Sequence, residues 1–323
     1  MNSGADVPNA TTVKPITIFG IPYFFAKDDA SSLAKKYNIP NIVIGLTIVA
    51  FGTSSPELAV SAYSAYTGNA EIAIGNVVGS NIANILLILG LTAAIYPLTI
   101  LKNTVLKEIP LSLLAAIVLF MMINDIKFSG QQNDIISLAD GVILLGFMII
   151  FMYYMLHLAK NSGESEDIQV QKLTILRATV YIISGLLLLV GGGKFFVDAA
   201  VGLAEGLGMS KAIIGLTIVA IGTSLPELAT SVVAAFKKNT DIAVGNIVGS
   251  NIFNIFLILG TSALVSPLPK GNITDIDLYA CIGASLLLLV SAYTFERHKV
   301  TRTEGLIFIV CYMAYIGYQI SIV

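Results

Sequence analysis

One 46-residue block of sequence occurs twice in this chain. Gly45–Gly90 and Gly215–Gly260 align without a gap at an offset of 170, and about two thirds of the paired positions are identical. Each copy places one glutamate, Glu57 or Glu227, inside a long apolar segment beside glycine, threonine, serine and proline. Matching acidic, interrupted segments in two halves of a membrane protein are typical of a cation-binding site near the bilayer midplane.

The composition indicates a membrane protein. Hydrophobic residues make up 56% of the 323 residues and charged residues only 12%, whereas a soluble domain carries about 25% charged residues. The sequence contains no basic patch of the kind that binds nucleic acid.

The long apolar runs must be helices if they lie in hydrocarbon, because an open sheet leaves backbone hydrogen-bonding groups without partners there. We expect nine spans: Ile39–Ala65, Ile72–Leu98, Ile109–Ile123, Ile135–Leu158, Ala178–Val197, Ala212–Phe236, Ile242–Leu268, Ile276–Thr294 and Gly305–Val323.

The two copies of the block enter the membrane from opposite sides. Five helices lie between corresponding points of the copies, and an odd number reverses the direction. The fold class is therefore an all-α polytopic membrane protein, an inverted-topology repeat of two five-helix halves. We expect the halves at 1–159 and 174–323, joined by a polar linker at 160–173. The first helix is short or degenerate, because Val13–Ala26 contains a lysine and two prolines.

Loop charges predict the orientation. Alternate loops carry 13 lysine and arginine residues on one side and 4 on the other, and the richer side of a membrane protein is cytoplasmic. This places the linker 160–173 in the cytoplasm and the C-terminus outside, in a multi-pass protein of the cell membrane. We expect the lipid bilayer as its surroundings and a monomeric state.

The residues around Glu57 are suited to opening a helix. Pro56 cannot donate a backbone hydrogen bond and clashes with the preceding turn, and Gly52 loosens the same region. We expect backbone carbonyls from about Ala50 to Thr53 to turn toward a cavity, where they can coordinate a cation. The second copy repeats this arrangement.

Each copy of the block predicts one set of oxygen ligands, because residues three or four apart share a helix face. Two carboxylates, many neutral oxygens and no suitable histidine or cysteine favour a hard cation such as Ca²⁺ over zinc or copper. The candidates are Ala50, Thr53, Ser54, Glu57, Ser80 and Asn84 in the first copy, and Ala220, Thr223, Ser224, Glu227, Ser250 and Asn254 in the second.

These motifs resemble those of the cation/calcium antiporter superfamily, and within it the sodium/calcium exchanger branch. The resemblance rests on GTSSPEL with GNVVGSNIANI, and on GTSLPEL with GNIVGSNIFNI. The two blocks cover under a third of the chain. The ten-helix, two-half layout of the family nevertheless fits nearly the whole chain. The resemblance implies a secondary antiporter that moves Ca²⁺ and Na⁺, needs no cofactor and is not an enzyme.

The resemblance also assigns roles. It makes Glu57 and Glu227 the central Ca²⁺ ligands, joined by oxygens of Thr53 and Thr223. Asn254 departs from the pattern, because archaeal sodium/calcium exchangers have an aspartate there, so this pocket holds two carboxylates instead of three. Sodium sites would draw on Ala50, Ser54, Ser80, Ala220, Ser224 and Ser250, with Asn84 near the centre.

Two other transport modes stay open. Proton/calcium exchangers resemble this chain but usually carry asparagine where Thr53 and Thr223 stand, so the GTS form favours sodium coupling over proton coupling. A cation channel would use the same oxygens as a selectivity filter, but a pore is usually rotationally symmetric and an inverted pair fits it poorly. An intramembrane enzyme is disfavoured, because the sequence lacks a suitable Ser/His, Asp/Asp or His-Glu-x-x-His arrangement.

Overall fold

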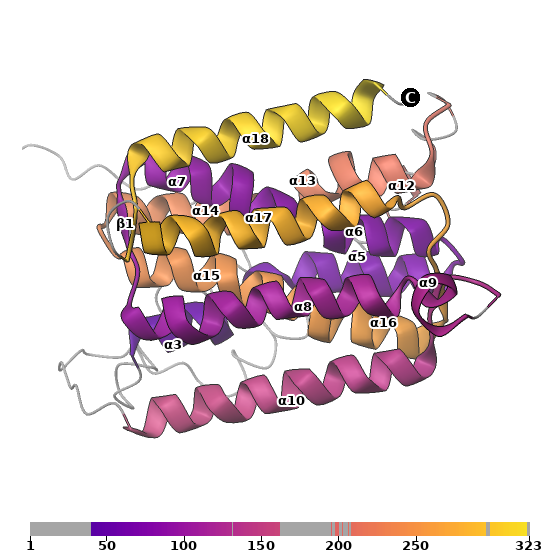
Figure 1. The fold of residues 1–323 in the computed structure, drawn as a ribbon, viewed down its shortest axis with the longest axis horizontal. Helices are drawn as coiled ribbons and strands as arrows, with labels where there is room; N and C mark the ends of the chain where they lie inside the picture. The colour runs from indigo at the N-terminus through magenta and orange to yellow at the C-terminus, as the bar shows by residue number, and fades with distance from the viewer. Residues whose placement is uncertain are drawn as a thin grey trace, which may run out of the picture.

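Long helices that run roughly along one common direction make up most of the described chain (Figure 1). The computed structural model describes residues 40–130, 132–161, 208–294 and 298–321, together with residues 195, 198, 199, 202 and 206. Six of the described helices are long and apolar enough to cross a membrane, or up to eight if each bent pair is one span. The apolar run Val13–Ala26, the linker beyond Asn161 and nearly all of Ala178–Val197 lie outside the described residues.

The first half contributes four of these spans, of which the first is a pair of helices bent by 46°. That pair comprises α3 (Asn41–Ile44), η2 (Gly45–Val49), α4 (Ala50–Thr53) and α5 (Ser55–Tyr66). The others comprise α6 (Ala70–Ile82), η3 (Ala83–Leu89), α7 (Gly90–Ile95), β1 (Leu98–Thr99), η4 (Thr104–Glu108), α8 (Ile109–Met122), α9 (Asp125–Ser129), β2 (Ile135–Ile136) and α10 (Leu138–Asn161).

The second half repeats the pattern in the described residues. Its bent pair, at 44°, comprises α12 (Lys211–Ile214), η5 (Gly215–Val219), α13 (Ala220–Thr223) and α14 (Leu225–Phe236). The rest comprises α15 (Thr240–Phe253), η6 (Asn254–Leu259), α16 (Gly260–Val265), β3 (Leu268–Pro269), α17 (Asp275–Thr294), β4 (Lys299–Val300) and α18 (Arg302–Ser321).

The all-helical inverted repeat predicted from the sequence is confirmed. In Figure 1, α3 begins at the left end of the molecule and α12 at the right end, so the matching bent pairs run in opposite directions. Eight of the nine expected spans match helices in the described residues. Three span ends were wrong. The second span stops at Ile95, the fourth starts at Leu138 and the seventh stops at Val265. The reason is the same in each case, because Leu98, Ile135 and Leu268 belong to short strands.

Two antiparallel strand pairs join loops at opposite ends of the molecule. β1 pairs with β4, with Leu98 opposite Val300, and β2 pairs with β3, with Ile136 opposite Leu268. The loop before α8 is therefore next to the loop before α18, although some 200 residues separate them. The β2–β3 pair joins the loop before α10 to the loop before α17 at the other end. The two strand pairs therefore connect the two halves outside the helices.

Three helices begin with a capping box, the pattern in which a serine or threonine and an acid three residues later bond each other's backbone. In α17, for example, the Thr274 backbone N–H and hydroxyl both donate to Asp277 Oδ2 at 2.8 Å. The same arrangement starts α10 with Ser137 and Asp140, and α18 with Thr301 and Glu304. These boxes fix the point at which each helix begins after a strand or loop.

The two halves approach each other closely at glycines of the repeated block. A Cβ atom added to Gly79 would overlap the Leu216 carbonyl oxygen and lie 2.8 Å from the Ala220 Cβ. A Cβ added to Gly249 would lie 2.7 Å from the Leu46 carbonyl oxygen. Small residues allow helix backbones to touch in this way. As a result, α6 packs on the second bent pair and α15 packs on the first.

We expect Gly79→Ala and Gly249→Ala to destabilise the protein, because the new methyl group meets backbone that cannot move aside. The expected loss is about 1–3 kcal/mol each, measured as a lower midpoint of thermal unfolding in detergent. Gly146→Ala is the matched control, because a Cβ there has no neighbour within 4 Å. Equal midpoints for all three variants would contradict the close approach.

Candidate cation site between the two halves

The two glutamates of the repeated block lie at the bends of the two broken helices. Glu57 is in the first turn of α5, just after the bend at Ser54, and Glu227 is in the first turn of α14, just after Ser224. Both side chains are completely buried, with 0% exposure. The positive end of a helix dipole favours an anionic group in its first turn, so both helices help to hold a carboxylate in the protein interior.

The bend differs in place from the sequence prediction. We expected the turn from Ala50 to Thr53 to be open, but these residues form helix α4, and the chain departs from helical geometry only at Ser54. The Ser54 and Ser224 N–H groups donate to the carbonyls of Ala50 and Ala220 at 2.9 and 3.1 Å. Pro56 explains the difference: it stands in the first turn of α5, where a missing N–H disrupts no hydrogen bond.

Each glutamate is bound by a serine of the opposite half. The Ser224 hydroxyl donates to Glu57 Oε1 at 3.1 Å, and the Ser54 hydroxyl donates to Glu227 Oε1 at 2.9 Å. The Ser250 hydroxyl also donates to Glu227 Oε1, at 3.3 Å. These reciprocal hydrogen bonds place both carboxylates at the same interface between the two halves.

Two asparagines that were not among the predicted ligands join the same network. The Thr223 hydroxyl donates to Asn76 Oδ1 at 2.9 Å, and the Thr53 hydroxyl donates to Asn246 Oδ1 at 3.0 Å. Each asparagine also donates its amide to the backbone carbonyl of the glutamate in its own half, at 3.4 and 3.3 Å. Both asparagines stand directly after a glycine at matching positions of the repeated block, which is the sequence signal that points to them.

Four further asparagines, two from each half, form a hydrogen-bonded cluster where the two halves meet. The amides of Asn81 and Asn251 donate to each other's backbone carbonyls at 3.2 and 3.3 Å. Asn84 Nδ2 donates to Asn251 Oδ1, and Asn254 Nδ2 donates to Asn81 Oδ1, both at 2.9 Å. The predicted ligands Asn84 and Asn254 are therefore held across the two halves by Asn251 and Asn81, which were not among the predicted ligands.

Asn84 and Asn254 lie in matching π-helical segments. Asn84 is in η3 and Asn254 begins η6, and such wide turns inside α-helices occur frequently at functional sites. The segment η3 packs against α14, which carries Glu227, and η6 packs against α5, which carries Glu57. Each asparagine thus comes close to the glutamate-bearing helix of the other half.

Four buried oxygens at this centre accept no hydrogen bond from the described residues. They are Glu57 Oε2, Glu227 Oε2, Asn84 Oδ1 and Asn254 Oδ1, two from each half. All four are acceptors, and leaving one buried acceptor without a partner costs about 1–3 kcal/mol. A cation satisfies several such oxygens at once, which a nearby hydroxyl cannot do.

The charges at this centre are two carboxylates without a cationic partner. The ion pairs of the described residues involve Lys127 and Lys270, and neither reaches Glu57 or Glu227. In the described part of the chain, no three or more His, Cys, Asp or Glu residues are grouped so that they could hold a metal ion among themselves. The donor set is therefore two carboxylates with hydroxyl, amide and carbonyl oxygens, which suits a hard cation such as Ca²⁺ or Na⁺.

Comparison with known proteins gives consistent matches over most of the chain. Residues 16–157 and 177–321 match the family model described as sodium/calcium exchanger protein. The chain is 38% identical over 299 residues to CaxA of Alkalimonas amylolytica, with 90% of each chain covered. It is 31% identical over 329 residues to the sodium/calcium exchanger MaX1 of Methanosarcina acetivorans, which covers 91% of this chain and 92% of MaX1.

A solved structure shares the fold. The sodium-calcium exchanger NCX_Mj, in a crystal soaked with Na⁺ and Sr²⁺, superposes with a TM-score of 0.67 and 35% sequence identity. The match covers 93% of this chain and 94% of that one.

We expect the asparagine cluster to act as one unit that holds the halves together. Asn81→Ala removes the acceptor of Asn254 Nδ2, and Asn251→Ala removes the acceptor of Asn84 Nδ2. Each variant should lose about 1–2 kcal/mol of unfolding free energy. The double variant should lose clearly less than the sum, because both residues belong to one network. Unfolding of the four proteins in detergent checks this, and strict additivity would contradict a shared cluster.

Proposed function

The chain belongs to the sodium/calcium exchanger protein family, and on that premise we propose that it exchanges Ca²⁺ for Na⁺ across a membrane. It is a multi-pass membrane protein of a transporter family, and its relatives support Ca²⁺ antiport as the basic activity. Sodium as the coupling ion is the finer part of the proposal. It is supported by the GTS form of both motifs and by the printed names of MaX1 and NCX_Mj.

The observation that carries the proposal is the set of four buried, unpartnered oxygens contributed equally by the two halves. In the proposed Ca²⁺-bound state, Glu57 and Glu227 ligate the ion through their Oε2 atoms. Thr53 and Thr223 complete this site with hydroxyl or backbone oxygens. Both threonine hydroxyls already donate to asparagines of the opposite half, which orients their lone pairs.

Sodium would use the same oxygens together with neutral ones beside them. The proposed Na⁺ ligands are carbonyl and hydroxyl oxygens that now share hydrogen bonds at the bends, with amide oxygens near the centre. For example, the Ser80 hydroxyl donates to the Ala220 carbonyl at 3.5 Å. These ligands are Ala50, Ser54, Ser80, Asn84, Ala220, Ser224, Ser250 and Asn254.

The buried charge explains exchange instead of leak. An empty site carries two carboxylates with no counter-charge, and isolated charges are costly in a membrane interior. The empty protein therefore resists the change between inward and outward states, whereas the cation-loaded protein does not. Inverted halves supply two nearly equivalent states, one open to each side.

The same count of charges sets the proposed stoichiometry. Ca²⁺ neutralises Glu57 and Glu227, and two Na⁺ ions do the same. Asn84 and Asn254 are neutral and hydrogen-bonded in matching ways, so each half offers one carboxylate and one amide oxygen. We therefore propose two Na⁺ ions for each Ca²⁺, with no net charge moved.

The orientation rests on the distribution of lysine and arginine. The β1–β4 pair contains Lys299 and lies close to Lys102 and Arg302 in the chain, whereas the opposite end carries Asp134 and Asp275 near Lys127 and Lys270. The proposal therefore places the β1–β4 end and the linker 160–173 in the cytoplasm. The C-terminus then lies on the other side.

We expect Glu57→Gln and Glu227→Gln each to reduce Ca²⁺ exchange by at least about 100-fold, because one charge is lost from a two-charge site. The measurement is exchange of radiolabelled Ca²⁺ in reconstituted vesicles. Asp241→Asn is the matched control, since it removes another acid of the second repeat, in the first turn of α15. Normal exchange in both glutamine variants would exclude these residues from the site.

We expect an outward Na⁺ gradient to drive Ca²⁺ uptake into Na⁺-loaded vesicles, with a rate that does not change when the membrane potential is set by K⁺ and valinomycin. Uptake that follows a pH gradient and ignores Na⁺ would favour proton coupling. A rate that changes with the imposed potential in either direction would contradict the two-to-one stoichiometry but not the antiport itself: exchange of three Na⁺ for one Ca²⁺ would be slower, and exchange of one Na⁺ for one Ca²⁺ faster, at inside-negative potential.

A further inference from the structure

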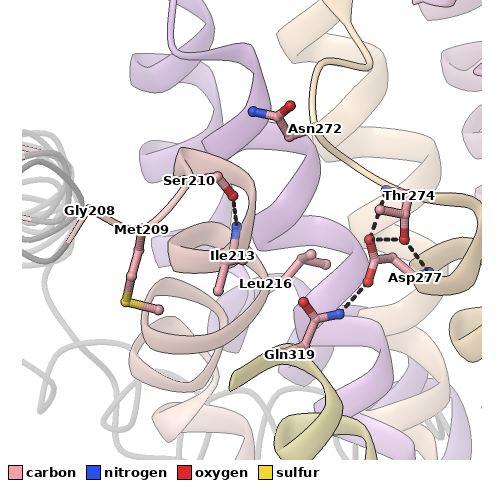
Figure 2. A pocket seen from close by; sticks show the side chains of 9 residues that line it. All are labelled: Gly208, Met209, Ser210, Ile213, Leu216, Asn272, Thr274, Asp277 and Gln319. Carbon is pink, nitrogen blue, oxygen red and sulfur yellow. Dashed lines mark hydrogen bonds between the residues drawn. The ribbon is translucent and has the colours of Figure 1, made fainter. Parts of the chain in front are cut away.

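A polar hollow lies at the end of the molecule where α12 begins, away from the candidate exchange site. It encloses about 320 Å³. In Figure 2 its walls come from the start of α12, the loop that leads into α17 and the last turn of α18. It is lined by Gly208, Met209, Ser210, Ile213, Leu216, Asn272, Thr274, Asp277 and Gln319.

The wall of this hollow includes a buried carboxylate surrounded by neutral donors. Asp277 is 1% exposed. Its Oδ2 atom accepts from the Thr274 capping box, and its Oδ1 atom accepts from Tyr315 Oη at 3.1 Å and from Gln319 Nε2. The acids of the other two capping boxes, Asp140 and Glu304, have no such additional donors from a neighbouring helix among the described residues.

The same wall presents an acceptor that is not used. Gln319 is also 1% exposed, and its Oε1 atom has no hydrogen-bond partner in the described chain. Its amide nitrogen is committed to Asp277, so the oxygen must face the other way, and Figure 2 shows it on the side of Leu216. The pocket therefore combines a negative charge with a free carbonyl oxygen.

Within the described residues, the three lysines at this end have other partners. Lys127 and Lys270 form ion pairs with Asp275, and Lys211 donates to Asn69 Oδ1 at 2.8 Å. A further acid, Glu71, accepts from the lining residue Asn272 at 3.4 Å. None of the ion pairs among the described residues includes Asp277.

We propose that the pocket of Asp277 and Gln319 binds a hydrated hard cation, Ca²⁺ or Na⁺, at one end of the protein only. The volume matches an ion with its water shell, since a water molecule occupies about 30 Å³ of liquid volume. Asp277 supplies the charge, while Gln319 Oε1 and Ser210 Oγ accept from the ion's water shell. The site is distinct from the exchange site, because Ser210 precedes Thr223 by 13 residues, or about 20 Å along a helix.

The repeat makes this site one-sided. The position that corresponds to Asp277 in the first half is Lys107, which lies 170 residues earlier and near the opposite end of the molecule. Lys107 there lies over the ring of Tyr154, 5.4 Å from its centroid. At this position one end of the protein thus carries an acid and the other end a lysine, although the helices match.

The test uses Tb³⁺, a Ca²⁺-like ion whose emission is sensitised by a nearby tyrosine, on the full-length Glu57→Gln/Glu227→Gln double variant. The chain contains no tryptophan, and the Tyr315 hydroxyl is 3.1 Å from Asp277. We expect saturable Tb³⁺ emission that Ca²⁺ displaces. Because both exchange-site charges are absent, this binding does not depend on the proposed function.

Adding Asp277→Asn should weaken Tb³⁺ binding at least 10-fold, and adding Tyr315→Phe should remove most of the emission. Gln319→Leu is a second variant that keeps the Thr274 cap and should also weaken binding. Asp140→Asn is the control, because it alters an equivalent capping box outside the pocket. Absence of saturable emission in the double variant, or unchanged affinity with Asp277→Asn and Gln319→Leu, would overturn the proposal.

Discussion

Two carboxylates buried without a counter-charge are the constraint on which the rest of this structure depends. Glu57 and Glu227 are fully buried. In each, one carboxylate oxygen accepts a hydrogen bond from a serine of the opposite half, and the other oxygen has no partner among the described residues. Burial of a lone charge is costly unless it is paired and hydrogen-bonded. The helix N-termini and the serine hydroxyls offset part of that cost. In the proposed mechanism a bound cation offsets the rest, and its loss makes the change between inward and outward states unfavourable.

The inverted repeat is what allows this constraint to be met. Each half alone would present one glutamate to lipid or water, but Gly79 and Gly249 let the bent pairs approach within contact of the facing backbone. At that distance the short side chains of Ser54 and Ser224 reach across to the other half. The asparagine cluster of α6 and α15 then fixes the register of one half against the other. Close packing and ion chemistry therefore depend on the same short stretch of sequence.

Much of this site was predictable, because its residues are written twice. The glutamates, threonines, serines and the two asparagines at 84 and 254 stand out by repetition inside apolar runs. The partners Asn76, Asn246, Asn81 and Asn251 were missed, because their role depends on which helix of the other half faces them, and sequence spacing reports only neighbours on one helix. The bend was placed one residue early for a related reason: Pro56 disrupts the turn before it only when it lies inside a helix, and here it begins one. The strands at the ends of three expected spans depend on partners some 130 to 200 residues away.

The most direct test of the account is the position of a heavy divalent cation in crystals of this protein. Anomalous diffraction from Sr²⁺-soaked crystals should show one strong central peak that contacts Glu57 and Glu227 together, and a soak in high Na⁺ without Sr²⁺ should remove it. Two separate peaks, each against a single glutamate, or a central region without Sr²⁺ at saturating concentration, would contradict a site shared by both halves.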